Sequence, residues 1–259
     1  MSPRSNPRGR PILCYVTDLR TLTASRAHSQ LTASRARPQL VASRSPFHTP
    51  PPSLLASHEP LLRTIEAAAH AGVDWIQLRE KNLSARACAA LTREALLLVQ
   101  QSSSGHAHPP RILVNDRLDV ALAERAGGVH LREDSLPVEE AKRLILDSSA
   151  AHSLPKDFLV GVSCHSLQAA ISAANVGADY IYFGPVFATP SKAAYGAPQG
   201  LERLAEICRA VSVPVLAIGG ITLQNAATCF DAGASGFAAI RLFQDAPDLP
   251  TIVRALREL

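Results

Sequence analysis

Polar side chains suited to phosphate chemistry lie at or shortly after the ends of several short apolar runs of this chain. They are Gln77, Arg79, Lys81, Asn115, Asp116, Asp134, Ser135, Ser163, His165, Thr189, Ser191 and Lys192. Cations disperse the negative charge of a diphosphate, and carboxylate and amide oxygens are ligands that suit Mg²⁺. Each residue alone has an ordinary structural role; Asp116 and Ser163, for example, would each make a good helix cap. If the runs end at one place in the fold, the set together fits a diphosphate with its Mg²⁺.

A glycine pair gives a second indication of phosphate binding. Gly219 and Gly220 end the apolar run from Pro214 to Ile218. Backbone amides at such a turn, with those after the run from Gly236 to Ile240, form an anion site of the kind that follows the last two strands of a (β/α)₈ barrel. A tight strand-to-helix turn would need the same two glycines. The choice therefore depends on the pattern in the rest of the chain.

One pattern of helix end followed by strand recurs four times. AGVDWIQL, AGGVHL, VGADYIYF and AGASGFAAI each place a glycine where a helix would end and then begin an apolar run too short for a helix. The runs predict strands near 12–17, 73–78, 111–114, 128–131, 159–163, 179–183, 214–218 and 236–240. Helical periodicity is found near 59–71, 84–101, 117–126, 137–147, 166–176, 200–210, 222–232 and 248–258. The strands are continuously apolar, which is typical of parallel strands covered on both faces. We therefore predict an α/β fold, a single (β/α)₈ TIM barrel.

The segment after the first predicted strand is unlike the rest of the chain. It contains a degenerate nine-residue repeat, LTASRAHSQ, LTASRARPQ and LVASRSPFH, followed by three prolines. Because it is poor in large apolar residues, we expect a disordered Arg/Ser/Pro-rich insert at 20–58 in a barrel of residues 11–259, with a disordered tail at 1–10. Residues 1–58 carry eight Arg and one acid, Asp18. This basic arm lacks interleaved aromatic residues, which disfavours nucleic acid as a partner.

The chain has features that are typical of a cytoplasmic protein. It has no apolar stretch long enough to span a membrane, and its first residues do not resemble a signal peptide. The five cysteines are odd in number and scattered, which favours buried, reduced thiols. We expect phosphorylated small molecules as its partners and no membrane. The sequence leaves the oligomeric state open, a homo-oligomer included.

Six short motifs resemble the thiamine phosphate synthase and TenI superfamily over roughly residues 60–259. They are QLREK, VNDR, GVHL, GVSCHS, GPVFATPSK and AIGGIT. In the synthase branch the resemblance implies the joining of an aminopyrimidine methyl diphosphate to a thiazole phosphate, with release of diphosphate. In the TenI branch it implies a metal-free tautomerase acting on the thiazole carboxylate phosphate. Retention of Arg79, Lys81, Asp116 and Lys192 favours the synthase. It also disfavours a non-catalytic regulatory barrel that binds thiamine intermediates.

The resemblance to the synthase also implies roles for individual residues. Arg79 and Lys81, with Gln77 and Asn115, would hold the pyrimidine diphosphate, and Lys192 would bind the leaving diphosphate. Ser163 would face the pyrimidine, and Asp116 would be a Mg²⁺ ligand. The thiazole phosphate would be held by Thr189, Ser191, Gly219, Gly220 and the backbone of Ile240 and Arg241. His165 occupies the position where TenI enzymes place a catalytic acid/base.

Two positions depart from the synthase pattern. Synthases typically read HLGQ-x-D where this chain reads HLREDS, so an ungapped alignment puts Ser135 at the position of the second metal carboxylate. Asp134 lies one residue earlier, and the second metal ligand is therefore either Asp134 or Ser135. Arg241 stands where synthases commonly have serine.

Overall fold

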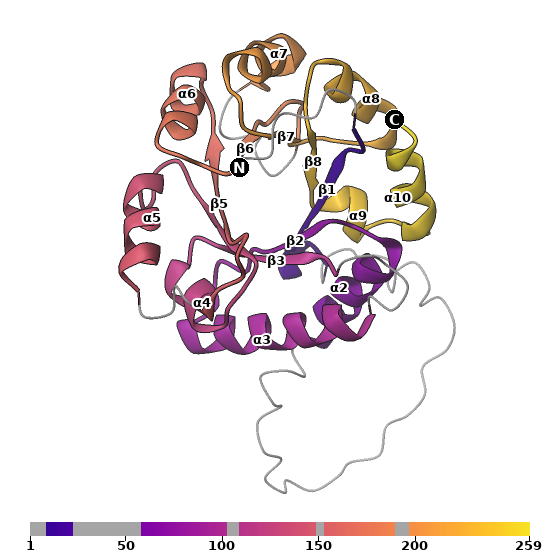
Figure 1. Ribbon diagram of the computed structural model, residues 1–259. Coiled ribbons are helices and arrows are strands. Elements are labelled where there is room, and N and C mark those ends of the chain that lie inside the picture. Colours follow the sequence, from indigo (N-terminus) through magenta and orange to yellow (C-terminus); the bar gives the residue numbers. More distant parts are fainter. Residues whose placement is uncertain (1–8, 23–57, 103–108, 149–152, 190–196) are drawn as a thin grey trace, which may run out of the picture.

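Eight parallel strands close into one barrel in the computed structural model, which describes residues 9–22, 58–102, 109–148, 153–189 and 197–259 (Figure 1). The strands pair in chain order, and β1 pairs with β8 to close the barrel. They are β1 Ile12–Val16, β2 Trp75–Leu78, β3 Arg111–Asn115, β4 Gly128–Leu131, β5 Leu159–Cys164, β6 Tyr180–Phe183, β7 Val215–Ile218 and β8 Gly236–Ala239. The predicted (β/α)₈ barrel is confirmed.

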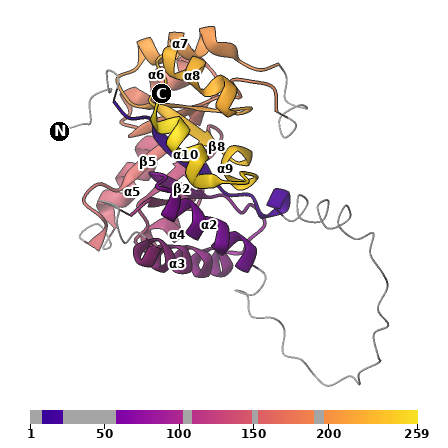
Figure 2. The same cartoon turned by 90° about the vertical axis from the view of Figure 1, so that its right-hand side faces the viewer.

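The helices alternate with the strands and surround the barrel (Figure 1). They are α2 Glu59–Ala71, α3 Ala85–Ser102, α4 Leu118–Ala123, α5 Val138–Asp147, α6 Leu167–Asn175, α7 Gly200–Ala210, α8 Leu223–Asp231, α9 Arg241–Gln244 and α10 Leu249–Arg257. The short helix α9 is not among those predicted from the sequence. Figure 2 shows α9 and the turn after β1 on the same side of the barrel. None of the described helices is long and apolar enough to cross a membrane.

The boundaries of the predicted insert, 20–58, differ from the structure at both ends. Residues 19–22 form a helical turn after β1, and Leu22 is buried. The expected start of the insert at residue 20 is therefore wrong, because Leu22 packs with the residues of the core. The expected end at residue 58 is wrong as well, because His58 is buried and is the N-cap of α2. The rest of the predicted insert, 23–57, and most of the predicted tail, 1–8, lie outside the described residues.

Alternate strand residues pack on opposite faces of the barrel wall. Tyr15 belongs to the cluster between strands and helices, whereas Cys14 belongs to the cluster inside the barrel. Large rings fill much of that interior, and Trp75 and Tyr180 lie 4.7 Å apart between ring centroids. A Cβ atom on Gly161 would lie 2.0 Å from the ring of Tyr180, so this strand position needs glycine. Side chains thus pack the barrel interior beneath the mouth.

The glycine pattern is confirmed at three of its four positions. Gly72, Gly177 and Gly233 have left-handed φ values of 84°, 90° and 101° where α2, α6 and α8 end. The expectation is wrong for AGGVHL, where Arg125 takes the left-handed conformation instead, with φ 54°. Gly128 serves a different need, because a Cβ there would lie 2.4 Å from the carbonyl oxygen of Leu159. The glycine allows β4 and β5 to approach each other.

The prediction that the cysteines are buried is confirmed for four of the five. All five are free thiols, and Cys14, Cys88, Cys164 and Cys229 are buried. The expectation of burial is wrong for Cys208, which is partly exposed at the edge of the buried stripe that α7 presents. Burial raises the pKa of the Cys164 thiol to about 12, which keeps it protonated. Cys164 is therefore a core residue rather than a nucleophile.

Candidate active site

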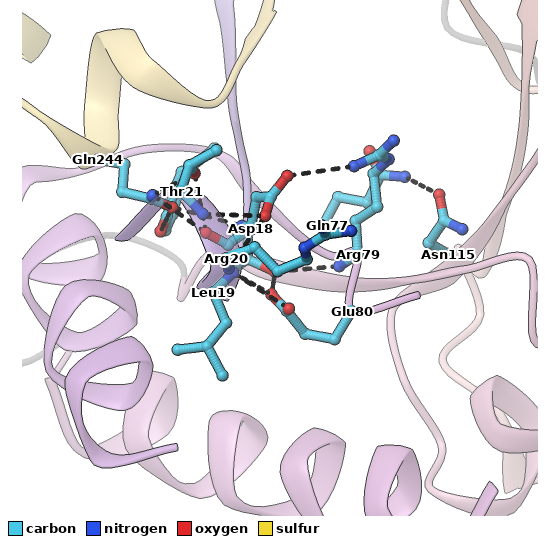
Figure 3. Close-up of polar contacts among 11 residues, drawn as sticks. Asp18, Leu19, Arg20, Thr21, Gln77, Arg79, Glu80, Asn115 and Gln244 are labelled. Atoms are coloured by element: carbon cyan, nitrogen blue, oxygen red, sulfur yellow. Dashed lines mark hydrogen bonds and ion pairs between the residues drawn. The ribbon is translucent and has the colours of Figure 1, made fainter. Parts of the chain in front are cut away.

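Gln77 and Asn115 form an amide pair at the carboxyl ends of β2 and β3 (Figure 3). Gln77 Nε2 donates to Asn115 Oδ1 over 2.8 Å, which fixes the orientation of the Gln77 amide. Gln77 is only 2% exposed. Its Oε1 atom is buried and has no hydrogen-bond partner within the described part of the chain. A buried acceptor of this kind is costly unless a ligand donates to it.

Arg79 lies next to this amide pair and is held by the end of β1 (Figure 3). Its backbone N–H donates to Thr17 Oγ1 over 3.0 Å, and its guanidinium lies 3.7 Å from an Asp18 carboxylate oxygen. The side chains of Arg79 and Asp18 are 26% and 21% exposed. The cation is therefore partly shielded from water and fixed at the mouth of the barrel.

Glu80 lies between the two predicted cations, Arg79 and Lys81. Its carboxylate is bonded to the chain after β1, and it therefore has a structural role rather than a ligand-binding one. Its carboxylate accepts from Thr17 Oγ1 over 2.7 Å and from the backbone N–H of Leu19 over 3.1 and 3.2 Å (Figure 3). Burial raises the pKa of Glu80, and the hydrogen bonds from Thr17 and Leu19 oppose that rise. No sequence pattern indicated this role for Glu80.

Gln244 on α9 joins the end of β8 to the turn after β1. Its Nε2 donates to Asp18 O over 3.1 Å and to Thr21 Oγ1 over 2.8 Å. Its Oε1 accepts from the hydroxyl of Tyr15 over 3.0 Å and from Asp18 N–H over 3.3 Å. This residue was missed because α9 is too short to show a helical period. The only sequence signal was a lone amide shortly after the last strand.

Two carboxylates face one guanidinium at the ends of β3 and β4. Arg132 Nε lies 3.3 Å from Asp116 Oδ2 and 3.1 Å from Asp134 Oδ1. Asp116 has a left-handed φ of 58°, and its N–H donates to His130 O over 2.8 Å. Its alternative role as a helix cap is wrong, because Arg117 is the N-cap of α4 and makes no side-chain cap bond in the described structure.

Ser135 lies in the same loop, but its side chain bonds to the backbone of that loop. Its hydroxyl donates to Arg132 O over 3.0 Å and accepts from Arg132 N–H over 3.1 Å. Asp134 is thus the residue of this pair that shares a cation with Asp116. Within the described ranges, no group of three or more His, Cys, Asp or Glu side chains could hold a metal ion. A divalent ion at Asp116 and Asp134 would need further oxygen ligands from a substrate or water.

Ser163 is supported from inside the barrel. Its hydroxyl lies 2.9 Å from His130 Nε2, and His130 Nδ1 lies 3.1 Å from the hydroxyl of Tyr180. Burial, and then the charge of Arg79, lower the pKa of His130 to about 3, so the ring is neutral at pH 7. The alternative role of Ser163 as a cap for α6 is wrong, because Ser166 caps that helix by accepting from Ala169 N–H.

His165 is oriented by a carboxylate from the neighbouring loop. Its Nδ1 lies 2.6 Å from Glu133 Oε2, and its backbone N–H donates to the same oxygen over 2.8 Å. Two contacts to one oxygen fix both the ring and the backbone at the end of β5. No sequence pattern indicated a role for Glu133.

The glycine turn after β7 is tightly enclosed. Gly219 and Gly220 have φ values of 94° and 68°, and a Cβ on either would lie 2.6 Å from the loop after β6. That loop is bonded to the turn, since Phe187 N–H donates to Gly219 O over 3.1 Å. Both glycines are therefore required for the local structure, as expected if they make a tight strand-to-helix turn. The tight turn does not exclude an anion site.

Three of the other predicted phosphate residues lie on the loops after β6 and β8, the strands that neighbour β7. Ile240 is the N-cap of α9 and Arg241 is its first residue. Thr189 ends a described stretch on the loop after β6, and Lys81 follows Glu80 after β2. Ser191 and Lys192 lie outside the described residues. The strand ends thus bring most of the predicted residues to one mouth of the barrel.

Fold and site together define a (β/α)₈-barrel enzyme with charged and amide groups at the carboxyl ends of its strands. A family model described as thiamine monophosphate synthase matches residues 51–243. This chain belongs to the thiamine monophosphate synthase family.

Relatives and a solved structure agree with this assignment. The thiamine-phosphate synthase of Roseiflexus castenholzii is 42% identical over 201 residues, which cover 78% of this chain and 82% of that protein. The thiamine-phosphate synthase of Chloroflexus aurantiacus is 43% identical over 195 residues, covering 75% and 83%. The structure of thiamine phosphate pyrophosphorylase from Pyrococcus furiosus has a TM-score of 0.64 and 31% identity, and the match covers 76% of this chain and 87% of that one.

Proposed function

We propose that this chain is a thiamine phosphate synthase, a transferase that joins an aminopyrimidine methyl diphosphate to a thiazole phosphate. The observation that carries the proposal is the buried acceptor Gln77 Oε1 beside Arg79. An amino group on a pyrimidine is a donor that this oxygen can accept from, and Arg79 is a cation that a diphosphate attached to the same molecule can reach. One substrate would therefore satisfy both groups.

The reaction needs positive charge where negative charge develops. The bond between the pyrimidine methylene carbon and the diphosphate oxygen breaks, and its electron pair leaves with the diphosphate. Arg79 and Lys81 stabilise that developing charge, and the electron-rich aminopyrimidine carries the complementary positive charge. The thiazole nitrogen then forms the new bond to the methylene carbon. No protein nucleophile takes part, so a protonated Cys164 is no obstacle.

Mg²⁺ is the cofactor that we propose, with Asp116 and Asp134 as its protein ligands. The fit rests on the donor set, because two carboxylates that already face one cation have the oxygen chemistry that Mg²⁺ prefers. When bound, the ion would neutralise charge on the diphosphate. Asp134 is preferred to Ser135 because the Ser135 hydroxyl is bonded to the backbone of Arg132.

The remaining residues would bind the second substrate and the leaving group. The thiazole phosphate would lie at the glycine turn, held by Thr189, Ser191, Gly219, Gly220 and the backbone of Ile240 and Arg241. Ser163, fixed by His130, would face the pyrimidine. Lys192 would bind the leaving diphosphate. A cytoplasmic location is proposed as well, and the five free thiols support it.

An assay of the purified chain with both phosphorylated substrates and Mg²⁺ tests the function. We expect thiamine phosphate and diphosphate in equal amounts, and loss of both products in the presence of a chelator. A second candidate function is the metal-free tautomerase, which the contact between Glu133 and His165 favours. Conversion of the thiazole tautomer without coupling, and insensitive to chelator, would select that function instead.

A further inference from the structure

Arg132 is placed so that one side chain neutralises both carboxylates of the proposed metal site. Its Nε atom lies 3.3 Å from Asp116 Oδ2 and 3.1 Å from Asp134 Oδ1. The backbone of Arg132 is fixed by Ser135, whose hydroxyl bonds to both its N–H and its carbonyl. The turn therefore holds the base of the side chain while the guanidinium extends toward Asp116.

We propose that Arg132 is a resident counter-ion that competes with divalent metal for Asp116 and Asp134. In the substrate-free protein the guanidinium occupies the carboxylates and weakens metal binding, so metal binds well only together with the substrate diphosphate. The inference rests on the Mg²⁺ site of the proposed function. It adds a residue that controls when that site is available.

Competition follows from the sizes and charges of the two cations. Mg²⁺ binds oxygen at about 2.0–2.1 Å in a nearly octahedral shell, which leaves no room for a guanidinium on the same oxygens. Two cations at one carboxylate also repel each other. One of them must leave when the other binds.

The structure indicates that Arg132 is the side chain that moves. Asp116 is held by its backbone bond to His130 and is 25% exposed, whereas the Arg132 side chain is 52% exposed. Arginine is long and flexible, and its planar guanidinium binds phosphate oxygens in pairs. A released Arg132 would remain at the end of β4 and could bind the diphosphate, so substrate and metal would favour the same rearrangement.

Manganese binding to the substrate-free full-length chain tests the competition without any turnover. Free Mn²⁺ is measured by electron paramagnetic resonance during titration of wild type, Arg132→Ala and Arg132→Lys. Because exposed ion pairs are weak, we expect Arg132→Ala to bind Mn²⁺ roughly 5-fold more tightly. Arg132→Lys keeps the charge and should stay close to wild type. Arg143→Ala, which removes an exposed cation paired with Glu140 on α5, is the charge control and should change nothing.

Asp116→Ala, made in wild type and in Arg132→Ala, separates the two proposals. If both are right, it weakens Mn²⁺ binding in both backgrounds and abolishes the gain from Arg132→Ala. If Asp116→Ala weakens binding but Arg132→Ala alone does not strengthen it, Arg132 is not a counter-ion and the metal site stands. If Asp116→Ala leaves binding unchanged in both backgrounds, there is no metal site at Asp116 and both proposals fail. Thermal unfolding of each variant establishes that it is folded.

Discussion

The mouth of the barrel has two sides that are held by different kinds of contact. The β1–β2 side, formed by Thr17, Asp18, Gln77, Arg79, Glu80 and Gln244, is joined by buried and partly buried hydrogen bonds. The β3–β4 side, formed by Asp116, Arg132, Glu133, Asp134, Ser135 and His165, is joined mainly by exposed ion pairs and a surface turn. Buried bonds resist rearrangement, whereas exposed ion pairs contribute little and exchange easily.

This difference indicates that the two sides have different functions. The β1–β2 side presents a fixed cation and a fixed acceptor, which suits recognition of a substrate before reaction. The β3–β4 side holds charges whose partners can change, which suits a metal that arrives with its substrate.

The largest effect is expected for Arg79→Ala on the β1–β2 side. Because Arg79 is fixed where charge develops on the leaving group, its loss should lower kcat by about 10²-fold or more. Steady-state kinetics with both substrates measures this. Arg93→Ala is the matched control, since Arg93 is an exposed cation paired with Glu124 on the outer surface. A rise in KM at unchanged kcat would show that Arg79 only binds the ground state.

Gln244→Ala should produce the largest loss of stability. It removes the partner of a buried tyrosine hydroxyl and two bonds to the backbone of Asp18, so the free energy of unfolding should fall by about 2–3 kcal/mol. Urea unfolding measures the change, with the exposed Gln224→Ala on α8 as control. A loss equal to that of the control would mean that the β1–β2 side is not a fixed unit.

The sequence predicted the strands that carry this site better than it predicted the contacts between the site residues. Continuous apolar runs and glycines at helix ends are local signals, and they predicted the strands whose ends carry Gln77, Asn115 and Ser163. The contacts of Glu80, Gln244 and Arg132 join loops that are far apart in the chain or depend on the course of one short turn. Such partners are determined by the pairing of the strands, because β1 pairs with both β2 and β8, and β3 pairs with β4.

Local sequence signals also gave wrong predictions where the same residue types suit two different local structures. AGGVHL has the glycines of a helix end, yet Gly128 is needed for strand approach and Arg125 makes the turn. Asp116 and Ser163 have the residue types of helix caps, yet neighbouring residues begin those helices. In each case the residue type is compatible with both roles, and only the packing of the strands selects one.

His130, which supports Ser163 from β4, should make the protein sensitive to acid. Its pKa is lowered to about 3 by burial, whereas an unfolded histidine titrates near 6.5. The unfolded state therefore binds more protons between these values, and the stability present above pH 6.5 is lost as the pH falls toward 3.

The pH dependence of urea unfolding for wild type and His130→Gln measures this effect. His130→Gln should be less stable at pH 7 but should lose less of its stability on acidification. His70→Gln, an exposed histidine on α2, should follow the wild-type profile. Parallel profiles for wild type and His130→Gln would show that other groups cause the acid sensitivity.

The smallest effects should separate Asp134 from Ser135 on the β3–β4 side. Asp134 is 80% exposed and shares a cation with Asp116, so Asp134→Ala should leave stability unchanged and raise the Mg²⁺ concentration needed for half-maximal activity. The Ser135 hydroxyl bonds only to the backbone of Arg132 among the described contacts, so Ser135→Ala should cost at most about 1 kcal/mol of stability and leave the Mg²⁺ requirement unchanged. Magnesium titrations of activity in the two variants measure the difference. A raised requirement in Ser135→Ala alone would mean that the turn opens when the metal binds, and that the ungapped alignment identifies the second ligand correctly.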